Sequence, residues 1–161
     1  MGNPDAKVHI VEFFDPACET CAQFHPFVKN ILKENKGKIK LTLRYATFHE
    51  GSEYIVKILE AAKKQGKYLE TLDLAFQTQS HWAIHHKANP EIFWRFLPKI
   101  GLDMKKLAKD VMDPKLDKLI AQDMKDAKAL GANKTPSYFV NGKPLQKFGY
   151  QELKDLINSE L

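Results

Sequence analysis

The fold is decided by one stretch near the start of the chain, residues 8–21, which reads VHIVEFFDPACETC. Residues 8–14 form an apolar, β-rich run that is long enough for a buried central strand. Residues 15–17 (DPA) are typical of a turn, because proline cannot continue a strand. From Cys18 onward apolar residues recur every three or four positions, which predicts a helix. The stretch therefore predicts a strand, a turn and a helix that begins at a cysteine.

The rest of the chain is predicted to contain more strands with a helical segment between them. Residues 39–45 alternate as a strand does and complete a βαβ unit. Residues 51–130 show helical periodicity and no strand candidates, and their last helix, 114–130, has a clean apolar stripe. After Gly131 the pattern returns to strands. We expect a strand at 135–140, a hairpin turn at 141–142, a short edge strand at 143–146 and a final helix after Gly149.

Length and composition exclude several classes of protein. The 161 residues suit one domain, or one domain with a large insertion. With 43% hydrophobic and 28% charged residues, the chain is unlike disordered, collagen-like or coiled-coil proteins. No apolar run approaches the ~20 residues of a membrane-spanning helix, so we predict no stable membrane insertion. The net charge of +5 is spread over interleaved lysines without a basic stripe, so we expect no nucleic-acid binding.

The chain has only two cysteines, Cys18 and Cys21. A permanent disulfide across so small a ring would constrain the unfolded chain little, and a structural zinc would need two more soft ligands. A reversible redox pair is the strongest interpretation, and we expect no metal and no cofactor. Unpaired N–H groups and the helix dipole favour an anion at a helix start. Cys18 is therefore the predicted attacking thiolate, and Cys21, one turn further in, the shielded resolving thiol.

These features resemble the thioredoxin superfamily, and most closely its bacterial DsbA-like thiol:disulfide oxidoreductases. The resemblance rests on VEFF at 11–14, the CETC motif, the helical insertion, Thr135-Pro136, and Asn141-Gly142 before a terminal helix. It implies an α/β thioredoxin fold, a central mixed sheet flanked by helices, with an inserted all-helical domain. Residues 1–50 and 131–161 would form the thioredoxin-like domain and 51–130 the insertion, with helix 114–130 bridging back to the core.

The resemblance also implies an activity, partners and a location. It implies dithiol–disulfide exchange with protein substrates that carry cysteines, and a redox partner, not identified by the sequence, that resets the pair. It further implies a periplasmic or secreted protein whose signal peptide, absent at residues 1–5, was removed. Because the chain has a single CxxC and no dimerisation segment, we expect a monomer.

Two further residues are assigned roles by the resemblance. Pro136 fits the superfamily's cis-proline, which faces the CxxC, and Thr135 would offer its backbone groups to an extended substrate. Glu12, on the strand entering the site, fits a buried acid that would accept the proton of Cys21. The alternative for Pro136 is an ordinary proline at the start of a strand. The alternative for Glu12 is a carboxylate that reaches solvent.

Glu19 and Thr20 stand between the cysteines, where the best-known oxidants of the family carry Pro-His. Both are predicted to contact substrate. As a like charge, Glu19 opposes the Cys18 thiolate by about 1 kcal/mol for an exposed pair. A less stable thiolate makes the couple less oxidising, so we expect an oxidase of moderate oxidising power.

Other interpretations stay open. The same pair suits a thioredoxin-like reductase or isomerase and, less well, a module that binds a soft metal such as Cu(I). His81, His85 and His86 could place two imidazoles on one helical face, although an exposed polar stretch fits better. His25 is interpreted as a surface or half-buried histidine. An aromatic cluster is interpreted as core in preference to a peptide groove: Trp82, Phe93, Trp94 and Phe96.

Overall fold

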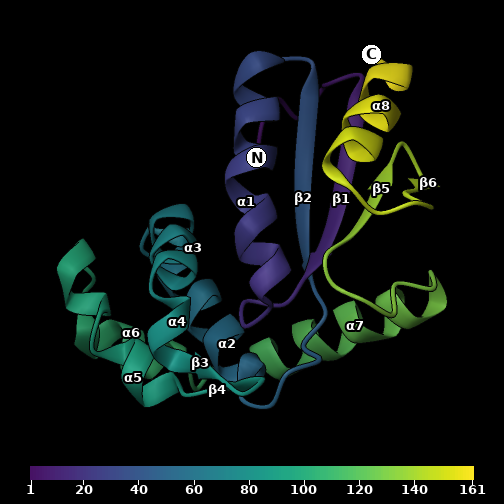
Figure 1. The fold of residues 1–161 in the computed structure, drawn as a ribbon. Coiled ribbons are helices and arrows are strands. Elements are labelled where there is room, and N and C mark those ends of the chain that lie inside the picture. The colour runs from purple at the N-terminus through teal and green to yellow at the C-terminus, as the bar shows by residue number, and fades with distance from the viewer.

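A four-stranded mixed sheet forms the centre of the lobe that holds both termini, in a computed structural model that describes all 161 residues, Met1–Leu161 (Figure 1). The strand order is β2-β1-β5-β6, with β1 parallel to β2 and antiparallel to β5. The strands are β1 (Val8–Phe14), β2 (Ile39–Tyr45), β5 (Ser137–Val140) and β6 (Lys143–Pro144). The predicted central strand at 8–14 and its parallel neighbour at 39–45 are confirmed.

Helices cover both faces of this sheet. On one face, apolar residues of α1 (Glu19–Glu34) and α8 (Tyr150–Glu160) pack against Val8 and Ile10 of β1. On the other face, Ala127 of α7 (Lys115–Ala129) packs against Phe13. Because side chains alternate along a strand, β1 is buried on both faces, as its continuous apolar run predicts.

The second lobe is made of short helices between β2 and α7 (Figure 1). Its core includes Trp82 and Phe93, whose side chains are completely buried, so these two aromatics are core residues as interpreted. None of the helices of the chain is both long and apolar enough to cross a bilayer. The elements are α2 (Ser52–Lys63), α3 (Tyr68–Gln77), α4 (Gln79–Trp82), α5 (Pro90–Trp94), the 3₁₀ helix η1 (Leu97–Ile100) and α6 (Met104–Asp110).

Two ion pairs connect α7 to the sheet. The Arg44 side chain on β2 donates to Asp123 at 2.5 Å and to Asp126 at 2.6 Å, and Asp123 also accepts the backbone N–H of Tyr45 at 3.0 Å. The predicted helix at 114–130 therefore contacts the sheet, as expected of a helix that connects the insertion to the thioredoxin-like core. The division into 1–50 with 131–161 and 51–130 stays a prediction.

The prediction that residues 51–130 contain no strand is wrong. Ala83–Ile84 (β3) and Lys87–Ala88 (β4) pair as a small antiparallel hairpin. Its turn consists of His85 and His86, whose φ angles are 51° and 62°. Histidine is one of the few non-glycine residues that adopt this left-handed conformation, and a turn without Asn-Gly is hard to detect in sequence. Since α4 ends at Trp82, the histidines of this segment do not share one helical face.

The predicted strand at 135–140 is also shorter than expected. β5 begins at Ser137, because Thr135 and Pro136 form a loop with a cis peptide bond before it. Proline has no N–H to contribute to a strand ladder. The edge strand is likewise limited to Lys143–Pro144, although Leu145 still donates its backbone N–H to the Tyr138 carbonyl at 2.9 Å.

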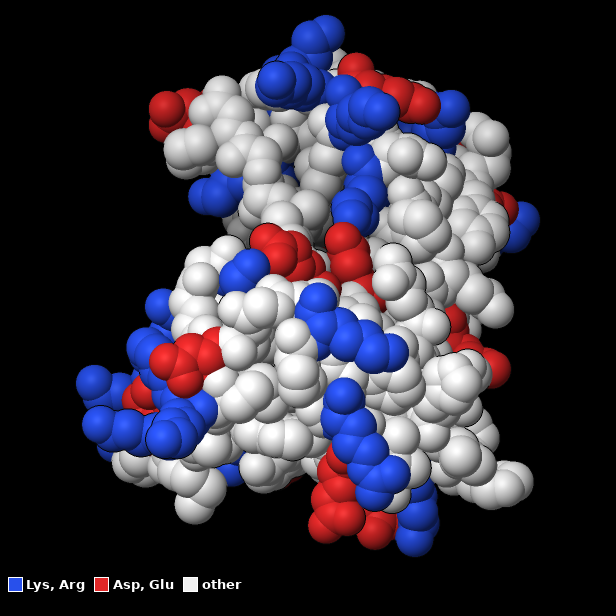
Figure 2. Space-filling view, turned by 90° about the vertical axis from the view of Figure 1, so that its left-hand side faces the viewer, with Lys and Arg blue, Asp and Glu red and all other residues white.

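Charged side chains of both signs are interspersed on the face formed by α1, α3 and α6 (Figure 2). Lys29 pairs with Asp73 at 2.8 Å, between α1 and α3. Lys106 pairs with Asp110 at 2.5 Å within α6. The net positive charge is therefore not gathered into a single basic field on this face.

Candidate active site

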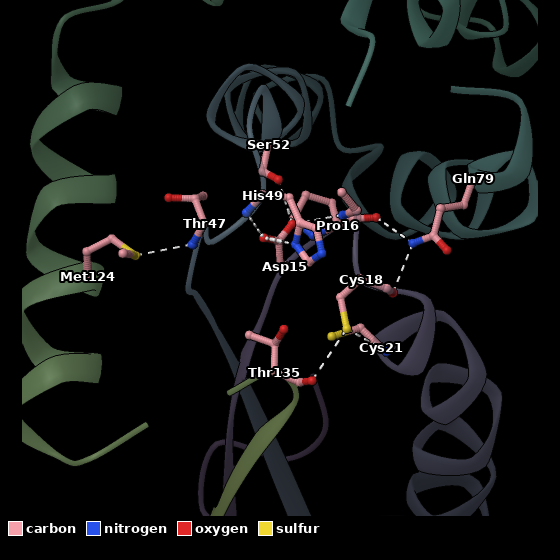
Figure 3. A network of polar contacts seen from close by, with 11 residues as sticks. Asp15, Pro16, Cys18, Cys21, Thr47, His49, Ser52, Gln79, Met124 and Thr135 are labelled. Carbon is pink, nitrogen blue, oxygen red and sulfur yellow. Dashed lines mark hydrogen bonds and ion pairs between the residues drawn. The ribbon is translucent and has the colours of Figure 1, made fainter. Parts of the chain in front are cut away.

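Cys18 occupies the N-cap of α1, directly after the turn that ends β1. Its sulfur accepts a hydrogen bond from the backbone N–H of Cys21 at 3.3 Å and lies 3.4 Å from the carbonyl oxygen of Thr135 (Figure 3). The two cysteines are not joined by a disulfide, Cys18 being 7% exposed and Cys21 completely buried. The structure thus brings the first turn of α1 and the cis-proline loop together around the sulfur of Cys18.

The two thiols differ sharply in acidity. Hydrogen bonding to Cys21 lowers the pKa of Cys18 to about 6, with Thr135 contributing in the same direction and burial opposing both. Burial raises the pKa of Cys21 well above its usual value, and the nearby charges of Cys18 and Glu12 raise it further. These shifts favour a thiolate at Cys18 and a thiol at Cys21 near neutral pH. The assignment of Cys18 as the attacking thiol stays a prediction.

The active-site turn is held by a buried acid that the sequence analysis treated only as a turn residue. Asp15 is completely buried. Its carboxylate accepts the backbone N–H of Ala17 at 2.9 Å and the hydroxyl of Ser52 at 2.7 Å. It also accepts the backbone N–H of His49 at 2.9 Å and lies 2.8 Å from Nδ1 of that ring. An acid directly after a buried strand was the only sequence signal for this network.

Gln79, at the start of α4, connects the helical lobe to the same turn. Its side-chain amide donates to the carbonyl of Pro16 at 2.8 Å and to the carbonyl of Cys18 at 3.0 Å (Figure 3). Because all these atoms are buried, the two carbonyls have no access to water as an alternative partner. No sequence signal pointed to Gln79, since its partners lie more than 60 positions away.

The predicted substrate residues lie along one groove, with one exception. Thr20, Thr135 and Pro136 line a groove of 630 Å³ beside the cis-proline loop, together with the half-exposed side chains of Leu130 and Phe148. Glu19 is exposed on the first turn of α1 and is not among the residues that line this groove. Their contacts with a substrate stay a prediction.

Glu12 is buried close to the cysteines. It is 4% exposed, so its carboxyl does not reach solvent. Burial raises its pKa to about 8, opposed by the hydroxyl of Tyr138, while the charge of Cys18 raises it further. A carboxyl with this pKa can both accept and return a proton near neutral pH, as the predicted role requires.

The acid that opposes the Cys18 thiolate most strongly is Asp15, not Glu19. Asp15 raises the pKa of Cys18, although less than hydrogen bonding lowers it. Glu19 is exposed, so water screens its charge. The pKa of Cys18 therefore depends on Asp15 and on hydrogen bonding more than on Glu19, the charged residue between the cysteines.

His25 lies on α1, two turns after Cys18. Its ring nitrogen Nε2 is 2.6 Å from Asp73 on α3, and burial lowers its pKa in spite of that carboxylate. Together with Lys29 these residues line a groove of 380 Å³ between α1 and α3. No group of three or more His, Cys, Asp or Glu side chains is arranged to hold a metal ion.

Comparisons with known proteins agree with this geometry. The Thioredoxin_4 family, described as thioredoxin, matches residues 1–159. The chain belongs to this family. Its fold is the DsbA-like form of the thioredoxin fold, with a helical insertion, which solved DsbA proteins share. The predicted fold class is confirmed.

The relatives include disulfide oxidoreductases. A solved thioredoxin-like oxidoreductase from Silicibacter pomeroyi DSS-3 is 30% identical with a TM-score of 0.84, over 99% of this chain and 89% of that one. The probable disulfide bond formation protein D of Bacillus anthracis is 29% identical, over 100% of this chain and 77% of the relative. The Na(+)/H(+) antiporter NhaA of Herminiimonas arsenicoxydans is 26% identical over 90% of this chain. The chain spans only 22% of the length of that antiporter.

Replacing Gln79 by alanine is expected to lower the free energy of unfolding by about 1–3 kcal/mol, because two buried carbonyls lose their donor. Thermal and urea unfolding of the reduced protein measure this. The matched control is Gln77→Ala, two positions away on an exposed side chain, which should change stability by less than about 0.5 kcal/mol. Equal stability of the two variants would show that the hydrogen bonds from Gln79 to Pro16 and Cys18 do not stabilise the turn.

Replacing Glu12 by glutamine is expected to stabilise the reduced protein at pH 7. Because the carboxyl has a pKa of about 8 when folded and 4.5 as its ordinary value, the unfolded chain ionises it first as pH rises. Native stability therefore falls as pH rises between these two values, by up to about 3 kcal/mol at pH 7, or roughly 9 °C in melting temperature. Glutamine removes that loss, so the two proteins should converge near pH 4.5. A variant that melts no higher at pH 7 would show that Glu12 is already ionised in the folded state.

Proposed function

We propose that this protein exchanges disulfides with cysteine-bearing protein substrates through Cys18 and Cys21. The observation that carries the proposal is the contrast between the two thiols at the start of α1. Cys18, which is 7% exposed, has its pKa lowered to about 6, and Cys21, which is completely buried, has a raised pKa. A permanent disulfide has no need of this contrast, whereas a nucleophile and its resolving thiol depend on it.

In the oxidising direction, a substrate thiolate attacks the sulfur of Cys18 in the Cys18–Cys21 disulfide. Cys21 leaves as a thiolate and takes a proton from Glu12. A second substrate thiolate then attacks the substrate sulfur of the mixed disulfide, and Cys18 leaves as a thiolate. The substrate is left with a disulfide and the protein with two reduced cysteines. The low pKa of Cys18 favours the second step, because it makes Cys18 a good leaving group.

The reverse sequence reduces or rearranges a substrate disulfide. The Cys18 thiolate attacks the substrate, Glu12 accepts the proton of Cys21, and Cys21 displaces the substrate thiolate from Cys18. Thr135 and Pro136 would bind an extended substrate segment in the groove beside them, with Thr20 on its other side. In either direction a redox partner resets the pair through a disulfide or dithiol of its own.

The direction, the oxidising power and the location belong to the same proposal. A Cys18 pKa near 6 stabilises the reduced form, which supports an oxidase of moderate power. The absence of any cysteine besides the pair supports a periplasmic or secreted protein, because additional thiols would mispair in an oxidising compartment. We expect the protein to act as a monomer.

The test is to replace each cysteine by serine and expose the variants to a reduced, unfolded protein and its oxidised form. Cys21→Ser should accumulate mixed disulfides on Cys18, because the resolving thiol is missing. Cys18→Ser should form almost none, since the remaining thiol is buried. Trapped adducts are counted by non-reducing electrophoresis and mass spectrometry. Equal trapping by both variants would contradict the assignment of Cys18 as the attacking thiol, and loss of Cu(I) binding without any adduct would favour a metal-binding module.

A further inference from the structure

Tyr138 carries a buried hydroxyl that the proposed chemistry does not use. The residue is 2% exposed, and its hydroxyl oxygen is enclosed without a hydrogen-bond partner. Buried hydroxyls in native proteins are nearly always paired, so an unpaired one needs an explanation. A phenylalanine would fill the same space without this cost.

The hydroxyl lies in the same compartment as Glu12. Tyr138 on β5 is directly opposite Glu12 on β1 in the antiparallel register. Residues opposite one another in such a pair project from the same face of the sheet. That face is covered by α1, where Tyr138 packs against Phe24 with ring centroids 6.1 Å apart. A phenol, a carboxyl and the thiol of Cys21 therefore share one buried space.

We infer that the Tyr138 hydroxyl donates a hydrogen bond to Glu12 when Glu12 is ionised, and so sets the pH at which Glu12 can accept the Cys21 proton. This inference rests on the proposed function, in which Glu12 exchanges that proton. Tyr138 is a positioning residue, since it acts on the reacting sulfurs only through the carboxylate.

The groups that shift the pKa of Glu12, Tyr138 and Cys18, include no cation. The titratable groups that face it are Cys18 and Cys21 from α1, Tyr68 from α3 and Tyr138 from β5. Its neighbour on β2 is Leu43, which is apolar.

Of the influences on Glu12, only the Tyr138 hydroxyl favours the ionised form. Burial and the charge of Cys18 both raise the pKa of Glu12, whereas the hydroxyl lowers it. The neutral acid is a weaker acceptor for the hydroxyl than the ionised carboxylate, which needs a donor in a dry space. The hydroxyl has no hydrogen-bond partner in the structure and would gain one once Glu12 loses its proton.

The Tyr138 hydroxyl would affect the step in which Cys21 resolves a mixed disulfide. The Cys21 proton passes to Glu12, the Cys21 sulfur bonds to the Cys18 sulfur, and the substrate leaves as a thiolate. Only the ionised fraction of Glu12 can accept the proton. Without the hydroxyl this fraction falls at neutral pH, so resolution should slow there and recover at higher pH.

Stopped-flow reaction of the reduced protein with 5,5′-dithiobis(2-nitrobenzoate) separates the two steps. The first release of coloured thiolate reports attack by Cys18, and the second reports resolution by Cys21. The variant is Tyr138→Phe. The matched control is Tyr150→Phe, since Tyr150 also stacks on Phe24 but has a side chain that is 46% exposed.

Tyr138→Phe should move the pH midpoint of the second phase upward by about one unit, with a several-fold slower second phase at pH 7. Its first phase should keep the wild-type midpoint near pH 6, which also shows that the variant is folded. Tyr150→Phe should match the wild type in both phases. An unchanged or lower second midpoint in Tyr138→Phe overturns the inference. Tyr138→Leu carries the same expectation should the phenylalanine variant not fold.

Glu12→Gln distinguishes this failure from a failure of the proposed function. If Glu12→Gln slows the second phase and Tyr138→Phe leaves its midpoint in place, only the inference is wrong. If Glu12→Gln has a wild-type second phase, Glu12 does not exchange the proton, and the inference is wrong together with that role.

Discussion

The hydrogen bond from the backbone N–H of Cys21 to the sulfur of Cys18 is the interaction on which the site depends. It caps the first turn of α1, and it also stabilises negative charge on the capping atom. The same hydrogen bond therefore both starts the helix and stabilises the Cys18 thiolate. The same geometry directs Cys21 inward, where burial raises its pKa. Any change that displaces the turn before α1 should therefore alter both stability and chemistry.

Residues outside the sheet stabilise that turn by hydrogen bonds. Asp15 accepts hydrogen bonds from Ser52 at the start of α2 and from His49 just before it, and Gln79 of α4 donates to the carbonyls of Pro16 and Cys18. The helical lobe thus supplies donors that the turn cannot find locally. This gives the insertion a physical role in shaping the redox centre, besides covering its surroundings. It also explains how an acid can stay buried next to a thiolate, since its charge is compensated by four hydrogen-bond contacts.

Sequence reasoning predicted what is encoded locally. The CxxC after a buried strand, the helix that starts at Cys18 and the strand pattern around Thr135-Pro136 are each written within a few positions. The roles of Asp15, Gln79 and Tyr138 could not be obtained in this way, because their partners come from distant segments. Tyr138 looks like an ordinary strand aromatic until the register sets it opposite Glu12. The hairpin at His85 and His86 was missed because its left-handed residues are not the usual ones.

The proposed function requires that Cys18 and Cys21 form a reversible couple whose reduced form is stabilised at the start of α1. The most direct test is the reduction potential of the pair, measured by equilibrating the protein in graded glutathione buffers. We predict a reversible two-electron transition at a potential near that of glutathione or more oxidising. A potential well below that of glutathione, or no reversible transition at all, would contradict this account.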